Sequence, residues 1–294
     1  MNSNPLAEVF GFPISNQSKK ANNFRINKLC PFSNIVPNCT KDKAQDPLGV
    51  CSILHNGECV ITCPVRFRED WSIIEDAARF AFPPEAKWTS LSEVKLNDID
   101  GKPAGNIDYV IVRLDDDGSV IDFVSVEVQG VYISGNLRNA FKNYIKNPSP
   151  DFKWDGENYP HPDYLSSSRK RLIPQMLSKG GIFKSWGKKQ CIVMQEEFFS
   201  TLPEIPVCTE AKADIAWFLY RLDHDKHTDT YHLALSRTVY TEYDSALNTV
   251  ISPRPGDIDV FLGTLQKKLA SRKPISVSPD NPQTILESPN DINE

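Results

Sequence analysis

The sequence predicts an α/β protein with a mixed central sheet flanked by helices, and three observations lead to this prediction. Residues 105–135 carry two alternating apolar runs separated by an Asp-rich turn, which is the pattern of a β-hairpin. Residues 71–82 and 136–146, on either side of that hairpin, repeat apolar residues at helical spacing. Residues 191–194 form a short apolar run that is typical of a strand buried inside a sheet.

The composition is that of a globular protein with a sizeable core. The chain has 294 residues, of which 40% are hydrophobic, enough for one large domain or a core with a small appended one. No segment approaches the ~18 consecutive apolar residues of a membrane-spanning helix, and residues 1–17 lack the charged and apolar regions of a signal peptide. We therefore expect a soluble, cytoplasmic protein without a membrane partner.

Charge is distributed unevenly along the chain. The net charge of −5 argues weakly against nucleic acid as a partner. Residues 9–41, however, contain Lys and Arg but no acid, and the same is true of residues 164–195. Two positive surfaces on an acidic protein predict contacts with double-stranded DNA, although the same residues also suit the solvated faces of helices.

The N-terminal region, residues 1–68, contains most of the cysteines. They are Cys30, Cys39, Cys51, Cys59 and Cys63. In a reducing cytosol, clustered cysteines indicate a metal site more often than disulfides. The region is rich in turn-forming residues and poor in periodic apolar ones, so it has little core of its own and needs a staple. Four thiolates around one tetrahedral ion would supply it; the alternative is that the cysteines are small unliganded hydrophobic residues.

Residues 69–270 hold the elements of the predicted sheet. Asp70 is placed to cap a helix over residues 71–82, and the prolines that follow end it. Residues 89–96 alternate as a first strand that carries Glu93. After the hairpin and the helix at 136–146 come a loop at 147–162, a basic helix at 164–178, strands at 191–194, 215–222 and 231–239, a helix at 257–270 and a mobile tail at 271–294.

The hairpin brings two acids together. If its turn is residues 115–118, Asp108 lies opposite Ser125 and on the same face as Glu127 and Gln129. Asp108 and Glu127 are then diagonal neighbours, roughly 7–8 Å apart at the backbone, close enough for both to bind one divalent cation. Glu127 also lies in a run that is otherwise apolar, and a buried acid needs a partner. The alternative is that both acids lie on a solvated face of the sheet.

Asp108 followed by the strand motif Glu127-x-Gln129 resembles the core of the PD-(D/E)xK nucleases, with Gln129 at the position that is usually Lys. A closer resemblance is to the NotI-type restriction endonucleases. It rests on the motifs CPFSNIVPNCTKDKAQDPLGVCSI, ITCPVRFRED, WTSLSEVKL, AGNIDYVIV and EVQGVYISGNLRNAF. The resemblance implies a nuclease-type central sheet with the N-terminal cysteine module packed beside it.

The same resemblance implies roles for the acids. Asp108 and Glu127 would hold Mg²⁺, with the backbone carbonyl of Val128 as a third ligand because it lies between Glu127 and Gln129. Glu93 would be a further active-site acid, although a solvated strand acid is an open alternative. Gln129 carries no positive charge, so we expect it to position the water or the phosphate by hydrogen bonding and to leave charge stabilisation to the metal.

Within the cysteine cluster, the family motifs match four residues and leave Cys59 out. The four are Cys30, Cys39, Cys51 and Cys63. The implied ion is a single iron, chemically similar to a rubredoxin centre, although the same four thiolates would also bind zinc.

The function implied is that of a type II restriction endonuclease, a homodimer that hydrolyses both strands of a DNA palindrome with Mg²⁺ and leaves 5′-phosphate ends. The resemblance implies a G·C-rich target centred on GGCC, with CGGCCG or GCGGCCGC as candidates. Arg66, Arg68 and Arg138 lie in matching motifs and are candidates for reading guanine or for binding phosphate. The alternative function is a non-catalytic DNA-binding metalloprotein that uses the nuclease-like sheet only as a scaffold.

Overall fold

The computed structural model describes residues 4–33, 37–43, 45–252 and 255–271. Backbone contacts divide the chain into two compact units, Met1–Ile251 and Ser252–Glu294. The domain boundary that we predicted near residue 68 lies inside the first unit. The predicted tail beyond Ser271 lies outside the described residues.

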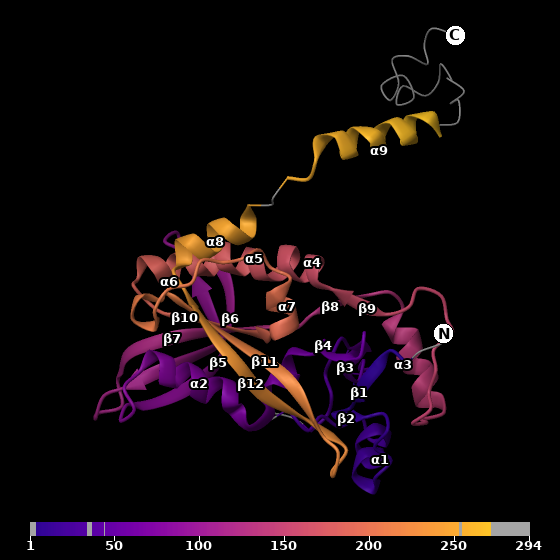
Figure 1. The fold of residues 1–294 in the computed structure, drawn as a ribbon. Coiled ribbons are helices and arrows are strands. Elements are labelled where there is room, and N and C mark those ends of the chain that lie inside the picture. Colours follow the sequence, from indigo (N-terminus) through magenta and orange to yellow (C-terminus); the bar gives the residue numbers. More distant parts are fainter. Residues whose placement is uncertain (1–3, 34–36, 44, 253–254, 272–294) are drawn as a thin grey trace. The chain divides into compact units, whose positions relative to one another are not determined.

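A six-stranded mixed sheet is the centre of the first unit (Figure 1). Its strands lie in the order β12-β11-β10-β7-β6-β5. Strand β10 runs parallel to both of its neighbours, and every other neighbouring pair is antiparallel. The predicted α/β fold with a mixed central sheet is therefore confirmed. The strands are β5 (Lys87–Asn97), β6 (Pro103–Leu114), β7 (Val120–Gln129), β10 (Gln190–Gln195), β11 (Ile215–Asp225) and β12 (Thr230–Thr241).

The register of the β6–β7 hairpin differs from the predicted one. The ladder pairs Tyr109 with Val126, so continuing it by one residue places Asp108 opposite Glu127 and not opposite Ser125. The prediction assumed a regular ladder and a four-residue turn, whereas the turn spans residues 115–119 and the ladder is irregular beside it. Because strand side chains alternate with a period of two, this shift by two residues leaves both acids on one face. It turns a diagonal pair into a directly opposed one.

Helix α2 (Ser72–Ala81) covers one face of the sheet and is amphipathic, as predicted. Its start differs from the prediction, because no side chain caps it. Asp70 and Trp71 adopt left-handed backbone conformations, with φ of 52° and 56°, so the Asp70 side chain is not in a capping position. The buried residues of the helix are Ile73, Ile74, Ala77, Ala78 and Phe80.

A nearly continuous helical segment, residues 164–185, covers the other face of the sheet. Figure 1 shows this segment and α2 on opposite sides of the sheet. The predicted helix at 164–178 is confirmed and continues to Ser185. Two of its turns are π-helical, a form that recurs at functional sites. The segment consists of α4 (Tyr164–Ser167), the π-turn η2 (Ser168–Leu172), α5 (Ile173–Gln175), the π-turn η3 (Met176–Gly180) and α6 (Gly181–Ser185).

The N-terminal region forms a sheet that packs into the main core, an arrangement that was not predicted. Its four-stranded sheet has the order β2-β1-β3-β4, and Leu6, Val9 and Ile53 are fully buried in the same cluster as the main core. The apolar runs escaped prediction because each strand is only a few residues long. The elements here are β1 (Leu6–Val9), β2 (Phe12–Pro13), α1 (Lys19–Ile26), β3 (Val50–His55), β4 (Glu58–Ile61) and the 3₁₀ segment η1 (Pro64–Trp71).

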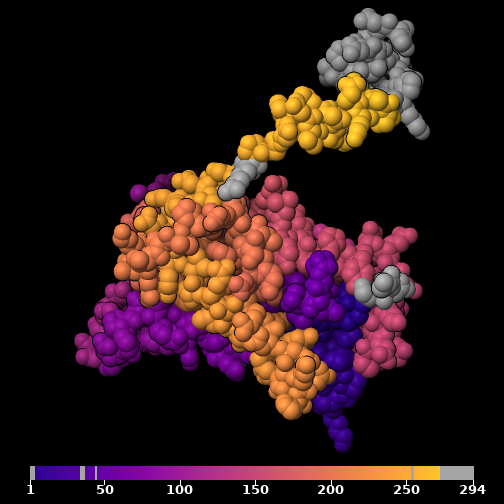
Figure 2. Space-filling view, viewed as in Figure 1, coloured from indigo at the N-terminus to yellow at the C-terminus, as the bar shows by residue number. Residues whose placement is uncertain are grey.

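The tip of the β11–β12 hairpin contacts the N-terminal region. Asn16 donates hydrogen bonds to the backbone carbonyls of Thr228 and Asp229. Figure 2 shows the hairpin tip, in orange, against the indigo N-terminal residues. The two sheets therefore belong to one unit.

The remaining elements connect the layers. In the first unit they are β8 (Tyr132–Ser134), α3 (Leu137–Lys146), β9 (His161–Asp163), α7 (Glu196–Ser200), the 3₁₀ turn η4 (Glu210–Lys212) and α8 (Tyr243–Ile251). The second unit contains α9 (Ile258–Ala270), which confirms the helix predicted there. Across the described residues, every helix is too short or too polar to cross a membrane.

Candidate active site

Asp108 and Glu127 lie at the centre of the main sheet, on the adjacent strands β6 and β7. The Asp108 carboxylate accepts a hydrogen bond from the backbone N–H of Val128, 2.8 Å away, and this bond ties it to the neighbouring strand. Asp108 is half-buried, and Glu127 is 7% exposed. The structure therefore brings the two predicted acids together, and Glu127 does not lie on a solvated face.

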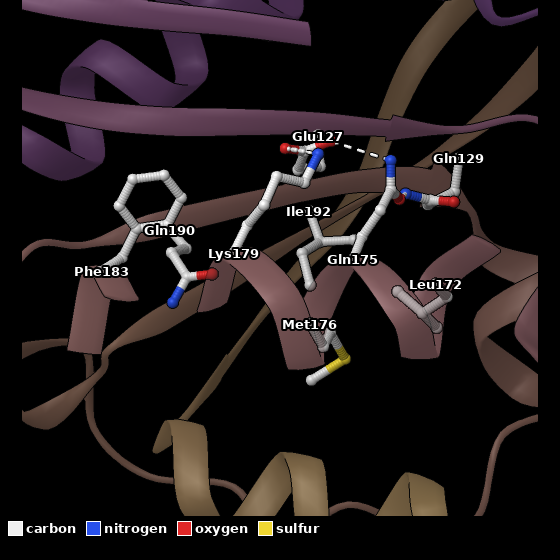
Figure 3. A pocket seen from close by; sticks show the side chains of 9 residues that line it. All are labelled: Glu127, Gln129, Leu172, Gln175, Met176, Lys179, Phe183, Gln190 and Ile192. Atoms are coloured by element: carbon white, nitrogen blue, oxygen red, sulfur yellow. Dashed lines mark hydrogen bonds and ion pairs between the residues drawn. The ribbon is translucent and has the colours of Figure 1, made fainter. Parts of the chain in front are cut away.

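The Glu127 carboxylate is the centre of a buried polar cluster (Figure 3). Lys179 Nζ lies 2.5 Å from Glu127 Oε1, and Gln175 Nε2 donates to Glu127 Oε2 at 3.1 Å. Burial, followed by the charge of Asp108, raises the pKa of Glu127 to about 7, against the opposing effects of Lys179 and Arg171. The carboxyl group is therefore poised between its two protonation states near neutral pH.

Gln129 lies two residues further along β7 and is 1% exposed. Its Nε2 donates to Oε1 of Gln175, so Gln175 bridges Gln129 and Glu127. The Oε1 atom of Gln129 is buried and has no hydrogen-bond partner. A buried amide oxygen without a partner, next to carboxylates, suits a place that receives a cation or a water molecule.

Gln175 and Lys179 are site residues that the sequence reasoning missed. Both come from the helical segment that covers the sheet, far from the hairpin in sequence. The sequence did contain a signal for Lys179, because it follows Leu172 and Met176 on the buried face of that segment. A lysine at a core position needs an acidic partner, and Glu127 is a buried acid in need of one.

Glu93 lies on β5, the strand next to β6. The ladder pairs Ser92 with Tyr109 and Val94 with Ile107, so Glu93 falls opposite Asp108. Glu93 has a φ of 53° and an exposed side chain, which marks a local break in the strand. The register thus places Glu93, Asp108 and Glu127 in one row across three strands, although no contact links the Glu93 side chain to the other two.

The donor set at this row fits a hard cation. Two carboxylates on neighbouring strands and an unpaired amide oxygen offer the oxygen ligands that Mg²⁺ prefers. As the side chains stand, however, no three His, Cys, Asp or Glu residues in the described part of the chain are arranged as ligands of one ion. Glu127 is instead paired with Lys179.

Four N-terminal thiols lie within electrostatic range of one another. Burial, together with the smaller effects of Cys63 and Cys39, raises the pKa of Cys30 to about 11. Burial also raises the pKa of Cys51, with Cys63 and Cys30 among its neighbours. Hydrogen bonds from the backbone of Phe32 and Ser33 to Cys30 act in the opposite direction.

The remaining cysteine of this region is set apart from these four. Cys59 interacts with the Tyr231 side chain and with Glu8, and burial raises its pKa to about 11. The main causes of that shift include no other cysteine. Cys39, Cys51 and Cys63 instead surround the amino group of Lys41, which donates to the backbone carbonyl of Val50 at 2.7 Å. In the described part of the chain, however, these thiols are not arranged as ligands of one ion.

The arginines that we predicted to contact DNA have different surroundings. Arg66 is 0% exposed, and its guanidinium group lies 3.0 Å from Glu8 and 2.8 Å from Glu69. The structure therefore contradicts a role for Arg66 in DNA binding, because acids inside the protein hold its donors. Arg68 lies over the Tyr109 ring at 5.6 Å, on the strand that carries Asp108. The ion pairs of Arg138 are with Asp42 and Asp46.

Comparison with known proteins provides independent evidence. The model of the family described as "Restriction endonuclease NotI" matches residues 9–233. The match includes the cysteines, the three acids and the helical segment with Lys179. A search of curated proteins found no match. Since the family match covers most of the chain, this protein belongs to the NotI family of type II restriction endonucleases, which are site-specific deoxyribonucleases.

Proposed function

We propose that this chain is a Mg²⁺-dependent type II restriction endonuclease of the PD-(D/E)xK type. The observation that carries the proposal is the opposed pair Asp108 and Glu127, with Gln129 on the same strand and a buried lysine against Glu127. The order of elements supports it, because three antiparallel strands are followed by a helical segment and then by β10, parallel to β7.

In the proposed reaction, Mg²⁺ would lower the pKa of an attacking water and stabilise charge on the scissile phosphate. Asp108, Glu127 and the carbonyl of Val128 would hold the ion, with Glu93 as a further acid at the edge of the row. Gln175 holds the Glu127 carboxylate in place. Hydrolysis joins the water oxygen to phosphorus and breaks the bond to O3′, which leaves 5′-phosphate ends.

A groove beside the acids supplies a path for the DNA backbone. Gly105, Asn106, Lys170 and Arg171 line it together with Lys179. Arg171 is also close enough to act on the pKa of Glu127. Because neutralisation of phosphates dominates the affinity for DNA, we assign the strand that is cut to this groove, with Arg68 and Arg138 left as candidates for further contacts.

Cleavage of phage DNA tests the function. We expect a discrete ladder of fragments with Mg²⁺ and none with EDTA. Asp108→Asn and Glu127→Gln should each abolish cutting and retain DNA binding, whereas Asp223→Asn, which removes an exposed acid paired with Arg221, should cut like the wild type. Binding without cutting by the wild type would support the alternative, a non-catalytic DNA-binding protein.

We also propose that the enzyme is a homodimer that cuts a palindrome centred on GGCC, such as CGGCCG or GCGGCCGC. A twofold DNA site is matched by twofold protein symmetry. Light scattering should give the mass of a dimer, and sequencing the ends of digested DNA should return the target. Ends that lack GGCC would refute the target and leave the nuclease assignment standing.

For the cysteine cluster we propose one iron ion, or zinc, bound by Cys30, Cys39, Cys51 and Cys63. Metal analysis of the purified protein should find about one ion per chain. Replacing any of the four by Ser should release the ion and destabilise the N-terminal region, because metal binding contributes to the folding of such sites. Cys59→Ser is the matched control and should retain the metal ion. A Cys59→Ser protein that loses the ion, together with a Cys63→Ser protein that keeps it, would contradict the choice of ligands.

A further inference from the structure

Lys179 is a buried cation at the proposed catalytic acids. It is 3% exposed, its Nζ lies 2.5 Å from Glu127 Oε1, and it donates to the backbone carbonyl of Asn106 at 2.7 Å. Asn106 lies two residues before Asp108 on β6, so Lys179 contacts both strands that carry the acids. A lysine placed in this way holds a positive charge at the centre of the site.

The surroundings of Lys179 fit its aliphatic stem. Gly105 has a φ of 127°, and a Cβ added there would lie 3.6 Å from Lys179 Cδ. Met176 and Phe183 flank the lysine along its own helical segment (Figure 3). Lys179 itself lies in the π-helical turn Met176–Gly180, which changes the direction of side chains relative to a regular helix. The fold therefore aims this side chain at Glu127.

Lys179 also lies on the boundary between the acids and the proposed DNA path. It lines the enclosed pocket that contains Glu127 and Gln129, and it lines the open groove that contains Lys170 and Arg171. A DNA strand in that groove would bring a phosphate next to Lys179 Nζ. Glu127, across the ion pair, is where we place the metal.

We propose that Lys179 is a catalytic residue that supplies, from a helix, the positive charge that Gln129 does not supply from the strand. This inference rests on the proposed nuclease function. With DNA bound, Nζ donates a hydrogen bond to a non-bridging oxygen of the scissile phosphate and stabilises the charge that grows there as the water oxygen attacks phosphorus. The proton of the water goes to solvent and O3′ takes a proton from solvent, so Lys179 transfers none.

A purely structural ion pair makes a different prediction. If Lys179 only neutralised Glu127, its replacement would destabilise the protein and raise the Mg²⁺ concentration that cleavage needs, and the rate of cleavage by the folded fraction at saturating Mg²⁺ would be unchanged. If Lys179 stabilises the transition state, the rate constant for cutting falls while the affinity for DNA is retained. The two effects can therefore be separated in single-turnover experiments.

The first experiment compares Lys179→Met, Lys179→Arg and the control Lys87→Met, which removes an exposed lysine paired with Asp116. Loss of one charge-stabilising donor typically costs about 10²–10³-fold in rate, and we expect a loss of that size for Lys179→Met. Lys179→Arg should retain part of the rate, and Lys87→Met all of it. DNA affinity, measured with Ca²⁺ in place of Mg²⁺, should change less than about threefold in all of them.

The second experiment places a lysine at position 129 on β7, where the PD-(D/E)xK motif usually has one. Gln129→Lys combined with Lys179→Gln should cut at least about tenfold faster than Lys179→Gln alone, because the charge is restored at the same place. This comparison does not depend on the stability of Lys179→Met. A Lys179→Met enzyme that folds and cuts within about twofold of the wild type, or a double variant without any rescue, would overturn the role of Lys179 and leave the nuclease assignment intact. Absence of cutting by the wild type would instead overturn the proposed function itself, and this inference with it.

Discussion

Glu127 and Lys179 are charged side chains in an apolar interior, and each makes the burial of the other tolerable. The same arrangement occurs in the N-terminal sheet, where Glu8 and Arg66 are both fully buried and paired. In the first pair the acid lines a pocket, the lysine also lines the groove, and both serve the proposed chemistry. In the second pair both residues are enclosed, so their role is structural.

Stability without metal should depend on pH through Glu127. Its pKa is raised to about 7 in the folded protein, so the folded state binds a proton more tightly than the unfolded state. Stability therefore falls as pH rises from about 4.5 to 7, the range between the unfolded and folded pKa values. The difference in stability between Glu127→Gln and the wild type should therefore shift in favour of Glu127→Gln across this range, by on the order of 1–3 kcal/mol between pH 4.5 and pH 8. Urea unfolding in EDTA at several pH values measures this difference, and a difference that does not vary with pH would contradict the assignment.

Breaking the Glu8–Arg66 pair should be costly. Arg66→Met leaves the Glu8 carboxylate buried without its cation, and loss of one partner of a buried pair typically costs about 3–5 kcal/mol. Arg79→Met is the control, because Arg79 is 70% exposed and pairs with Asp76 at the surface, where such pairs contribute under about 1 kcal/mol. Thermal or urea unfolding of both variants tests this. Equal losses of stability in Arg66→Met and Arg79→Met would show that the burial of Arg66 has no energetic consequence.

At the scale of elements, the site depends on how the helical segment 164–185 packs on the sheet. Tyr243 of α8 anchors it, since its hydroxyl donates to the carbonyl of Met176 at 2.9 Å. Gly180 is in contact with the same ring, and a Cβ there would lie 2.5 Å from Tyr243 Cε2. Close approach of α8 to the π-turn therefore requires glycine at position 180.

Two neighbouring glycines give a matched test of this packing. Gly180→Ala should lower stability by about 1–3 kcal/mol, because the added methyl group overpacks the contact with Tyr243. Gly181→Ala, whose Cβ would lie 3.5 Å from the Tyr243 hydroxyl, should raise stability by about 0.5–1 kcal/mol through helix propensity. Urea unfolding distinguishes the two. A stabilising Gly180→Ala would show that α8 does not pack as described.

At the scale of the whole molecule, all proposed functional residues belong to the first compact unit. That unit ends at Ile251, and the family match ends at residue 233. Catalysis is therefore expected to reside in the first unit alone.

A chain that ends at Ile251 tests this division. It should fold cooperatively, as seen by circular dichroism and thermal unfolding, and should cut DNA at a rate within about twofold of the full chain. The full-length protein is the control at equal concentration. A truncated protein that folds but no longer cuts would place a required function in the second unit.

Local sequence determined the elements that depend on local periodicity. Alternation with a period of two predicts the hairpin and the common face of Asp108 and Glu127, and helical spacing predicts α2 and α3. These signals need no knowledge of distant residues. A shift in register by two residues does not change which face a side chain lies on. The predicted face of Asp108 is therefore right, although its predicted partner is wrong.

Only the tertiary structure decided which distant residues meet. Lys179 and Gln175 reach Glu127 because a helical crossover joins β7 to the parallel strand β10 and lays that segment over the face that carries the acids. Arg66 is enclosed because the N-terminal sheet buries Glu8 beneath it. Such contacts follow from how apolar faces pack over long sequence separations, and a strand or helix pattern contains no information on its partner. The acids of this site could therefore be found in the sequence, whereas the cation that accompanies them required the fold.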